Sequence, residues 1–184
     1  MLRIFFIAIC ISIAALIMHY GQAMSNTIRH DMPTNVEYHD LSDPVKKEID
    51  CLADNIYFES AHESTTGKIG VAFVTMNRVK SGIFPDSICQ VVKQQQSNVC
   101  QFSWYCESGP KRKSITKVLT KQNDSLYNEI RKLAVTFYLN HENMKDPTKG
   151  ALFYHADYVN PQWSNLKRTA VIGRHIFYNK RSNA

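Results

Sequence analysis

The sequence lacks an apolar run as long as a membrane-spanning helix usually needs. The run near the N-terminus, IFFIAICISIAALIM, covers 15 residues, 4–18, whereas a spanning helix usually has ~20. Arg3 precedes this run, and Gly21 and Ala23 follow it as small residues at the positions that a signal peptidase reads. The layout predicts a signal peptide over residues 1–23, cut after Ala23. The alternative is a retained N-terminal anchor.

A zinc-binding spacing of cysteines is also missing. After residue 23 the cysteines follow one another with C-x10-C and C-x5-C spacings, which fit no common zinc pattern. An even number of cysteines in an exported chain predicts two disulfides, and the pairing stays open. The cysteines concerned are Cys51, Cys89, Cys100 and Cys106. We therefore expect a periplasmic or secreted protein without a metal, with a zinc site as the competing interpretation.

The chain has no excess of acidic residues and no internal repeats. Without Arg3, 21 basic residues stand against 16 acidic ones, a net charge of +5. Such a surface favours polyanions, which for an exported protein means cell wall or membrane surface rather than nucleic acid. The alternative is that modest basicity only aids solubility. We expect no stable membrane insertion after signal cleavage, and the oligomeric state stays open.

Apolar spacing places helices and strands along the rest of the chain. Residues 24–44 are polar and predict a linker or N-terminal arm, and residues 45–184 then suit a single domain. Strand character is confined to 151–156 and 170–178, which could pair as a small antiparallel sheet. Helices are predicted over 45–61, over the apolar stripe 69–79, from Pro85 to Val92, and from Asp124 through Tyr138.

Glu59 stands out because it lies on the apolar seam of the first predicted helix. It follows Leu52 by seven residues and Ile56 by three, which places it on the buried stripe or at its edge. Burial raises the pKa of a carboxyl group, and a carboxylic acid that keeps its proton can donate it to a leaving oxygen in glycoside cleavage. The alternative is that Glu59 leans into solvent or pairs with Arg78.

Glu63 has a less specific reading. It lies past the expected helix end, where it could pair with a base or cap the next helix. Two carboxylates on one helix also lie on one side of a substrate, whereas the acid and the nucleophile or base of a two-carboxylate hydrolase flank the scissile bond. Spacing alone therefore does not make Glu59 and Glu63 a catalytic pair.

Four stretches of the chain resemble the SleB-type cell-wall hydrolases, a family that includes spore-cortex-lytic enzymes. The first, NIYFESAHESTTGKIGVAFVTMNRV, is similar to the family signature Y-x-E-A-x-x-E…G-x-x-A-V-A-x-V-x-x-N-R. The others are FPDSICQVV with CQFSWYC, ALFYHADYVNPQW, and IGRHIFY. They occur in the family's order and span roughly residues 50–178. The family's Glu-Ala-Arg-Gly-Glu is Glu-Ser-Ala-His-Glu here, so its arginine and glycine are absent and the position of Glu63 is in doubt.

The resemblance implies a fold and a reaction. The fold class is α+β, mainly α: a lysozyme-like single domain with a small antiparallel β-sheet. The reaction is cleavage of peptidoglycan between N-acetylmuramic acid and N-acetylglucosamine by lytic transglycosylation. Glu59 matches the catalytic glutamate, which protonates the glycosidic oxygen and then helps the 6-hydroxyl of the muramic acid close on its own anomeric carbon. No cofactor is required. Hydrolysis by water is the alternative if Glu63 or Asp157 faces the opposite side.

The same resemblance supplies candidates for a sugar groove. An amide, a hydroxyl and aromatic or imidazole rings suit the N-acetyl groups, ring hydroxyls and faces of a glycan. Supporting roles are assigned to Glu63 and Tyr158, whereas Trp163 and His175 are expected to be structural. The substrate-binding candidates are Gln101, Ser103, Trp104, Tyr154 and His155, with core packing as the alternative for Trp104 and a backbone-bonded core position for His155.

Two other function classes compete with this prediction. A non-catalytic peptidoglycan-binding protein would use the same groove but would not need a protonated acid at Glu59. A wall amidase or peptidase would need a Cys-His pair or a zinc site, and the cysteines are better explained as disulfides. For the transglycosylase and for the non-catalytic binding protein alike, the expected partner is the peptidoglycan glycan strand.

Overall fold

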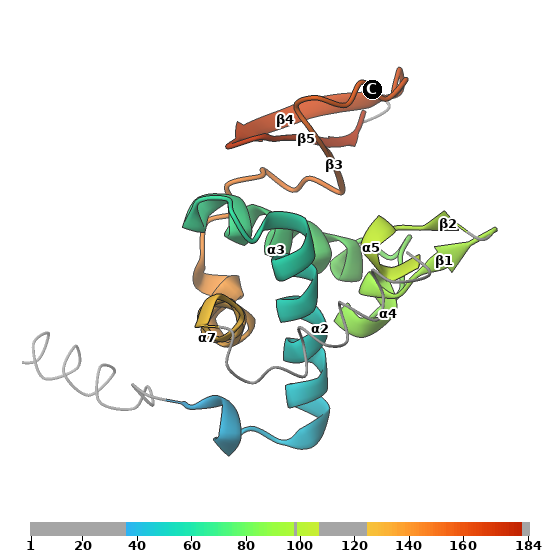
Figure 1. Cartoon of the computed structure of the whole chain (residues 1–184). Coiled ribbons are helices and arrows are strands. Elements are labelled where there is room, and N and C mark those ends of the chain that lie inside the picture. The colour runs from blue at the N-terminus through green and yellow to red at the C-terminus, as the bar shows by residue number, and fades with distance from the viewer. Residues whose placement is uncertain (1–35, 98, 107–124, 182–184) are drawn as a thin grey trace, which may run out of the picture. The chain divides into compact units, whose positions relative to one another are not determined.

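The structure, a computed structural model, describes residues 36–97, 99–106 and 125–181 (Figure 1). The chain divides into two units, residues 1–37 and 38–184, and the helices and strands described below belong to the second. The predicted signal peptide, and the predicted arm before residue 36, lie outside the described residues. Among the residues that are described, no helix is both long and apolar enough to cross a membrane.

Helix α2 spans Asp43–Ser60, close to the predicted 45–61. A proline in its first turn costs no hydrogen bond, because the first N–H groups of a helix have no partner within it. Before it, the 3-10 helix η1 (Tyr38–Asp40) falls within the predicted arm, and the Tyr38 hydroxyl donates to Asp50 at 2.7 Å. The C-terminal end of the predicted arm therefore contacts α2. The buried face of α2 consists of Ile49, Leu52, Ala53 and Ile56.

Three further helices pack with α2 around the main hydrophobic core. The sequence predicted each of them, because each carries an apolar stripe or a capping residue. The Ser64 hydroxyl accepts a hydrogen bond from Gly67 N at 3.2 Å and caps the second helix of the domain. Phe73 and Phe137 meet edge to face with 4.9 Å between ring centroids. The helices are α3 (Thr65–Lys80), α4 (Ile88–Val92) and α7 (Ser125–Asn140).

Two disulfides settle the pairing that the sequence left open. Cys51–Cys89 joins α2 to α4 inside the core. Cys100–Cys106 joins β2 (Val99–Cys100), which pairs with β1 (Gln95–Gln96), to the short helix α5 (Ser103–Cys106). All four cysteines after residue 23 are thus bonded, so the zinc interpretation fails.

The C-terminal part forms a three-stranded antiparallel sheet in the order β3-β5-β4. The strands are β3 (Phe153–Ala156), β4 (Leu166–Ile172) and β5 (His175–Lys180). The segment 170–178, predicted as one strand, is instead the hairpin between β4 and β5. Gly173 turns the chain with a φ of +56°, a conformation that glycine adopts without steric cost. The predicted mainly helical α+β class is confirmed.

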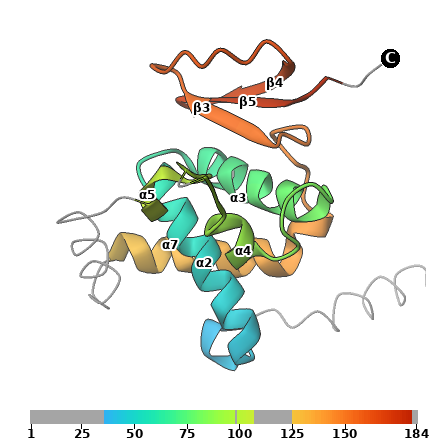
Figure 2. The same cartoon turned by 90° about the vertical axis from the view of Figure 1, so that its right-hand side faces the viewer.

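One face of this sheet packs against α3, as both views show (Figure 1, Figure 2). Phe177 is fully buried there, in a small cluster with Val74 and Ala151. Gly70 of α3 allows this approach, because a Cβ at that position would meet the Phe177 ring at 3.0 Å. The sheet is therefore seated on the helix that precedes it by about seventy residues in the chain.

The turn over residues 145–150 is ordered by the carboxylate of Asp146. This group accepts hydrogen bonds from Thr148 N at 2.7 Å and Gly150 N at 2.8 Å. It also accepts one from Asn77 Nδ2 of α3 at 3.0 Å. The turn therefore fixes where β3 begins relative to α3, and β3 carries one of the candidate site residues.

Candidate active site

Glu59 lies in the last turn of α2 and is half-buried. Its carboxylate accepts a hydrogen bond of 2.8 Å from the hydroxyl of Tyr154 on β3. The two residues are 95 positions apart in the chain, and the seating of the sheet on α3 brings them together. Tyr154 is itself held by ring contacts with His175 at 5.1 Å and Phe177 at 5.7 Å.

Burial raises the pKa of the Glu59 carboxyl above the ordinary glutamate value. The Tyr154 hydrogen bond and the positive charge of Arg78 lower this pKa, but by less than burial raises it. The same burial raises the pKa of Tyr154 well above that of a free tyrosine, so its hydroxyl stays a donor. The site thus holds a carboxylic acid whose proton is retained to higher pH than in water.

A cleft with a volume of about 270 Å³ is lined in part by Glu59. It is lined by the consecutive residues Tyr57–Glu63, which form the end of α2 and the loop that follows. Glu59 therefore lies where a ligand can reach it. A proton donor beside an accessible cleft is the arrangement that general acid catalysis needs.

An aromatic pair stands next to the cleft. Phe58 lines the cleft, and Trp104 of α5 stacks on it with 4.6 Å between ring centroids. The Trp104 indole N–H donates to the buried Asn55 Oδ1 at 3.1 Å, and Asn55 in turn donates to Thr75. This chain of hydrogen bonds fixes the tryptophan, so Phe58 and Trp104 form a rigid aromatic wall suited to the face of a sugar ring.

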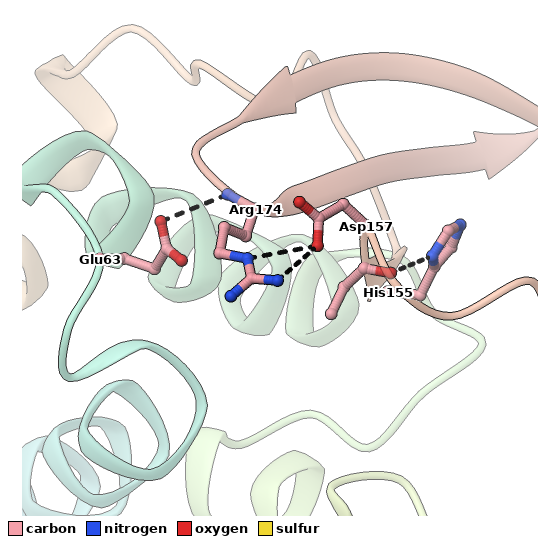
Figure 3. A network of polar contacts seen from close by, with 5 residues as sticks. Glu63, His155, Asp157 and Arg174 are labelled. Atoms are coloured by element: carbon pink, nitrogen blue, oxygen red, sulfur yellow. Dashed lines mark hydrogen bonds and ion pairs between the residues drawn. The ribbon is translucent and has the colours of Figure 1, made fainter.

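Glu63 forms a separate network at the β4–β5 turn, drawn in Figure 3. Its Oε2 accepts a hydrogen bond from Arg174 N at 3.4 Å. The guanidinium of Arg174 pairs with Asp157 at 3.2 Å and lies over the exposed ring of Tyr158 at 5.2 Å. A side chain at Gly173 would overlap the Glu63 carboxylate. Glu63, Asp157 and Tyr158 are thus joined through one turn, and both carboxylates already have partners.

A family model described as Cell Wall Hydrolase matches residues 62–178, which is more than half of the chain. The chain belongs to the Cell Wall Hydrolase family. A curated relative, the spore cortex-lytic enzyme of Bacillus cereus, is 29% identical over 159 residues, which are 85% of this chain and 52% of the relative. The chain therefore spans about half the length of the curated relatives that it matches.

Two solved structures share the fold of this cell wall hydrolase. One is the catalytic domain of the germination-specific lytic transglycosylase SleB from Bacillus anthracis, with 28% identity and a TM-score of 0.50 over 80% of this chain and 100% of that chain. The other is the catalytic domain of the Bacillus cereus SleB protein, with the same identity and TM-score over 80% of this chain and 95% of that one. The family predicted from the sequence is confirmed.

The remaining predicted site residues are spread over the cell wall hydrolase domain. Gln101 is half-buried and its backbone N–H donates to Gln94 O at 3.0 Å, while Ser103 is exposed at the start of α5. Both lie in the segment that also carries Trp104.

The matched family range begins at residue 62, just after Glu59, so the role of Glu59 rests on its geometry and on the resemblance.

His155 points away from the Glu59 site. It neighbours Tyr154 on β3, and successive side chains of a strand point to opposite faces of the sheet. Its ring stacks on Tyr178 and its Nε2 lies 3.0 Å from the Tyr178 hydroxyl, while Nδ1 lies 2.8 Å from Ala156 O. Trp163 packs on the same rings at 5.4 and 5.6 Å. Figure 3 shows His155 well away from Glu63.

Sequence reasoning assigned no site role to Asn55, Phe58 or Asn77, and considered Arg78 only as a partner for Glu59. The N-R pair in the first family stretch was the available signal for Asn77 and Arg78.

Within the ranges that the structure describes, no group of three or more histidine, cysteine or acidic side chains could hold a metal ion.

Proposed function

We propose that the chain cleaves the glycan strand of peptidoglycan between N-acetylmuramic acid and N-acetylglucosamine as a lytic transglycosylase, with Glu59 as the single catalytic carboxyl group. The observation that carries the proposal is the half-buried Glu59, with a raised pKa, beside an accessible cleft. The fold shared with the SleB domain described as a lytic transglycosylase supports the reaction type.

The proposed reaction uses one group twice. Glu59 donates its proton to the glycosidic oxygen as the bond to the anomeric carbon breaks, and the Tyr154 hydroxyl stabilises the resulting carboxylate at 2.8 Å. The carboxylate then takes the proton of the muramic acid 6-hydroxyl as that oxygen bonds to the anomeric carbon. The products are a 1,6-anhydromuramic end and a free N-acetylglucosamine end, and Glu59 is again protonated.

A single carboxyl group agrees with the partners of the other two acids. Glu63 accepts from the backbone of Arg174, and Asp157 pairs with its guanidinium. Both acids are thus engaged by Arg174 at the β4–β5 turn. The proposed substrate contacts are Phe58 in the cleft with Trp104 stacked on it, for a sugar face, and Gln101 and Ser103 of the segment that carries Trp104, for polar groups.

The proposal places the protein outside the cytoplasm, in the periplasm or secreted, after removal of residues 1–23. Mass spectrometry of the protein recovered from the producing cells tests this. A mature chain that begins at Met24 supports export, whereas an intact N-terminus in the cell-bound fraction supports an anchor.

The deciding experiment is digestion of purified peptidoglycan sacculi, with mass spectrometry of the released muropeptides. Anhydro ends support the transglycosylase, reducing ends indicate hydrolysis by water, and intact sacculi with bound protein indicate a binding protein. We expect Glu59→Gln to fold and to lose at least about 100-fold in rate, the lower bound for loss of a general acid. Glu63→Gln is the matched control in the same cleft and should keep most of the activity. If Glu59→Gln cleaves as the unmodified protein does, the assignment of Glu59 is wrong.

A further inference from the structure

Arg78 of α3 is a buried cation, with only 4% of its surface exposed. Its guanidinium contacts two aromatic rings, 5.0 Å from the centroid of Phe84 and 4.9 Å from that of Phe102. Cation–π contacts of this kind hold a positive charge in place without a carboxylate partner. In the described part of the chain its Nη1 is buried with no hydrogen-bond partner. The fold thus retains a charged group that a purely structural core position would not require.

Arg78 also holds the start of β3. Its Nε donates to Leu152 O at 2.8 Å, two residues before Tyr154. The preceding residue, Asn77, donates to Ala151 O at 3.1 Å. The two neighbouring side chains therefore bind two successive carbonyl groups, and they fix the strand at the point from which the Tyr154 side chain reaches Glu59.

The charge of Arg78 acts on both members of the site. It lowers the pKa of the Glu59 carboxyl and that of the Tyr154 hydroxyl, against the opposing effect of burial. In turn, burial lowers the pKa of Arg78, and Tyr154 and Glu59 raise it. The cleft lining also holds the titratable side chains of Tyr57, His62 and Glu63, and the ring of His175 packs on Tyr154.

We propose that Arg78 is a positioning residue for Glu59: it sets the Tyr154 hydroxyl against the carboxyl group and stabilises the carboxylate that forms when Glu59 gives up its proton. The catalytic consequence rests on the proposed function, but the electrostatic part does not. A buried positive charge near Glu59 offsets the cost of ionising a carboxyl group away from water. Without it, the acid would give up its proton less readily.

The test is the titration of the Glu59 side-chain carboxyl carbon by NMR, without substrate, with its signal assigned from the Glu59→Gln variant. Arg78→Met removes the charge and keeps an unbranched side chain at this position. We expect Arg78→Met to raise the Glu59 pKa by about one unit or more, the usual effect of losing a nearby opposite charge. Arg78→Lys keeps the charge and should leave the pKa close to its original value.

Asn77→Ala is the control for the strand contact, because it breaks the hydrogen bonds of Asn77 to Ala151 O and to the Asp146 carboxylate without removing a charge. It should reduce activity and move the Glu59 titration less than Arg78→Met does. Equal shifts in Asn77→Ala and Arg78→Met, or no shift in Arg78→Met, overturn the proposal. If Arg78→Met fails to fold, Arg78→Gln, which also removes the charge, takes its place: a Glu59 pKa raised by about one unit or more supports the proposal, and an unmoved pKa overturns it.

The pH profile of kcat/KM gives the second readout. Because Glu59 acts first as an acid, the rate falls as the pH rises through its pKa, and Arg78→Met should move this fall to higher pH. If the unmodified protein does not cleave sacculi but the titration still shifts as expected, the proposed function fails and the role of Arg78 stands. If cleavage occurs and the titration does not shift, the proposed function stands and the role of Arg78 fails.

Discussion

Replacing Tyr154 by phenylalanine removes one hydroxyl group and leaves the ring in place. That hydroxyl donates to the Glu59 carboxylate at 2.8 Å. A hydrogen bond to a charged group contributes about 1.5–3 kcal/mol, and one pKa unit corresponds to about 1.4 kcal/mol. The loss of this bond should therefore raise the Glu59 pKa by about one to two units.

The assay is the pH dependence of the initial rate of muropeptide release from sacculi at low substrate concentration. Glu59 must be protonated to act, so the rate falls as the pH rises through its pKa. In Tyr154→Phe this fall should occur about one to two pH units higher. The maximal rate should be lower, because the carboxylate formed during cleavage has lost a donor.

The same change has a signature in stability. The folded-state pKa of Glu59 lies above its ordinary value, so its contribution to stability is complete at low pH and is lost as the pH rises through the folded-state pKa. Tyr154→Phe raises the folded-state pKa of Glu59 further, so more of this stability is lost as the pH rises. Urea unfolding should therefore show a larger destabilisation at pH 8 than at pH 4, with a difference of up to about 3 kcal/mol.

Tyr178→Phe is the matched control. It removes a hydroxyl from the opposite face of the same sheet, where the partner is His155 Nε2 at 3.0 Å. We expect no shift of the pH profile from this variant. The electrostatic coupling between Tyr154 and Glu59 is refuted by either of two results. Tyr154→Phe leaves the pH profile unmoved, or both variants move it equally.

Two further predictions concern stability. Gly173→Ala places a side chain against the Glu63 carboxylate at a φ of +56°, whereas Gly82→Ala meets nothing within 4 Å at a φ of +70°. The Glu63 carboxylate can move aside, so by urea unfolding the first should cost about 0.5–1.5 kcal/mol more than the second, the net contribution of the Arg174–Glu63 hydrogen bond that it displaces; equal costs would contradict the contact. Burial raises the pKa of Asp54 to about 6, so its contribution to stability is complete below about pH 4 and is lost as the pH rises through 6. In Asp54→Asn this loss should disappear, which reduces the fall in unfolding free energy between pH 4 and 7 by up to about 3 kcal/mol; an unchanged fall would place the titration elsewhere.

Periodicity predicted the helices well because their apolar stripes are local. The seam Ile49, Leu52 and Ile56 is buried as its spacing requires, and the same spacing places Glu59 at the edge of the core. Ser64 caps α3, whereas α4 is capped by Ser87 and begins at Ile88, three residues after the predicted start at Pro85. These features depend on neighbours within one or two helical turns, and so they can be read along the chain.

The sheet was harder to predict, for a local reason. The segment AVIGRHIFY is rich in β-branched and aromatic residues on both sides of Gly173, so it resembles one strand. The structure turns it into a hairpin whose β5 pairs with both β3 and β4. Because alternate residues face opposite sides, this register directs Tyr154 to Glu59 and its neighbour His155 away, which the sequence alone did not separate.

The sequence by itself determined the helical framework, the family resemblance, and a glutamate placed where burial would raise its pKa. Only the tertiary structure decided what surrounds that glutamate. Tyr154 and Arg78 lie 95 and 19 positions along the chain from Glu59, and no periodic pattern links them to it. They meet because the sheet is seated on α3, and the balance between burial, a hydrogen bond and a positive charge exists only once that packing has formed.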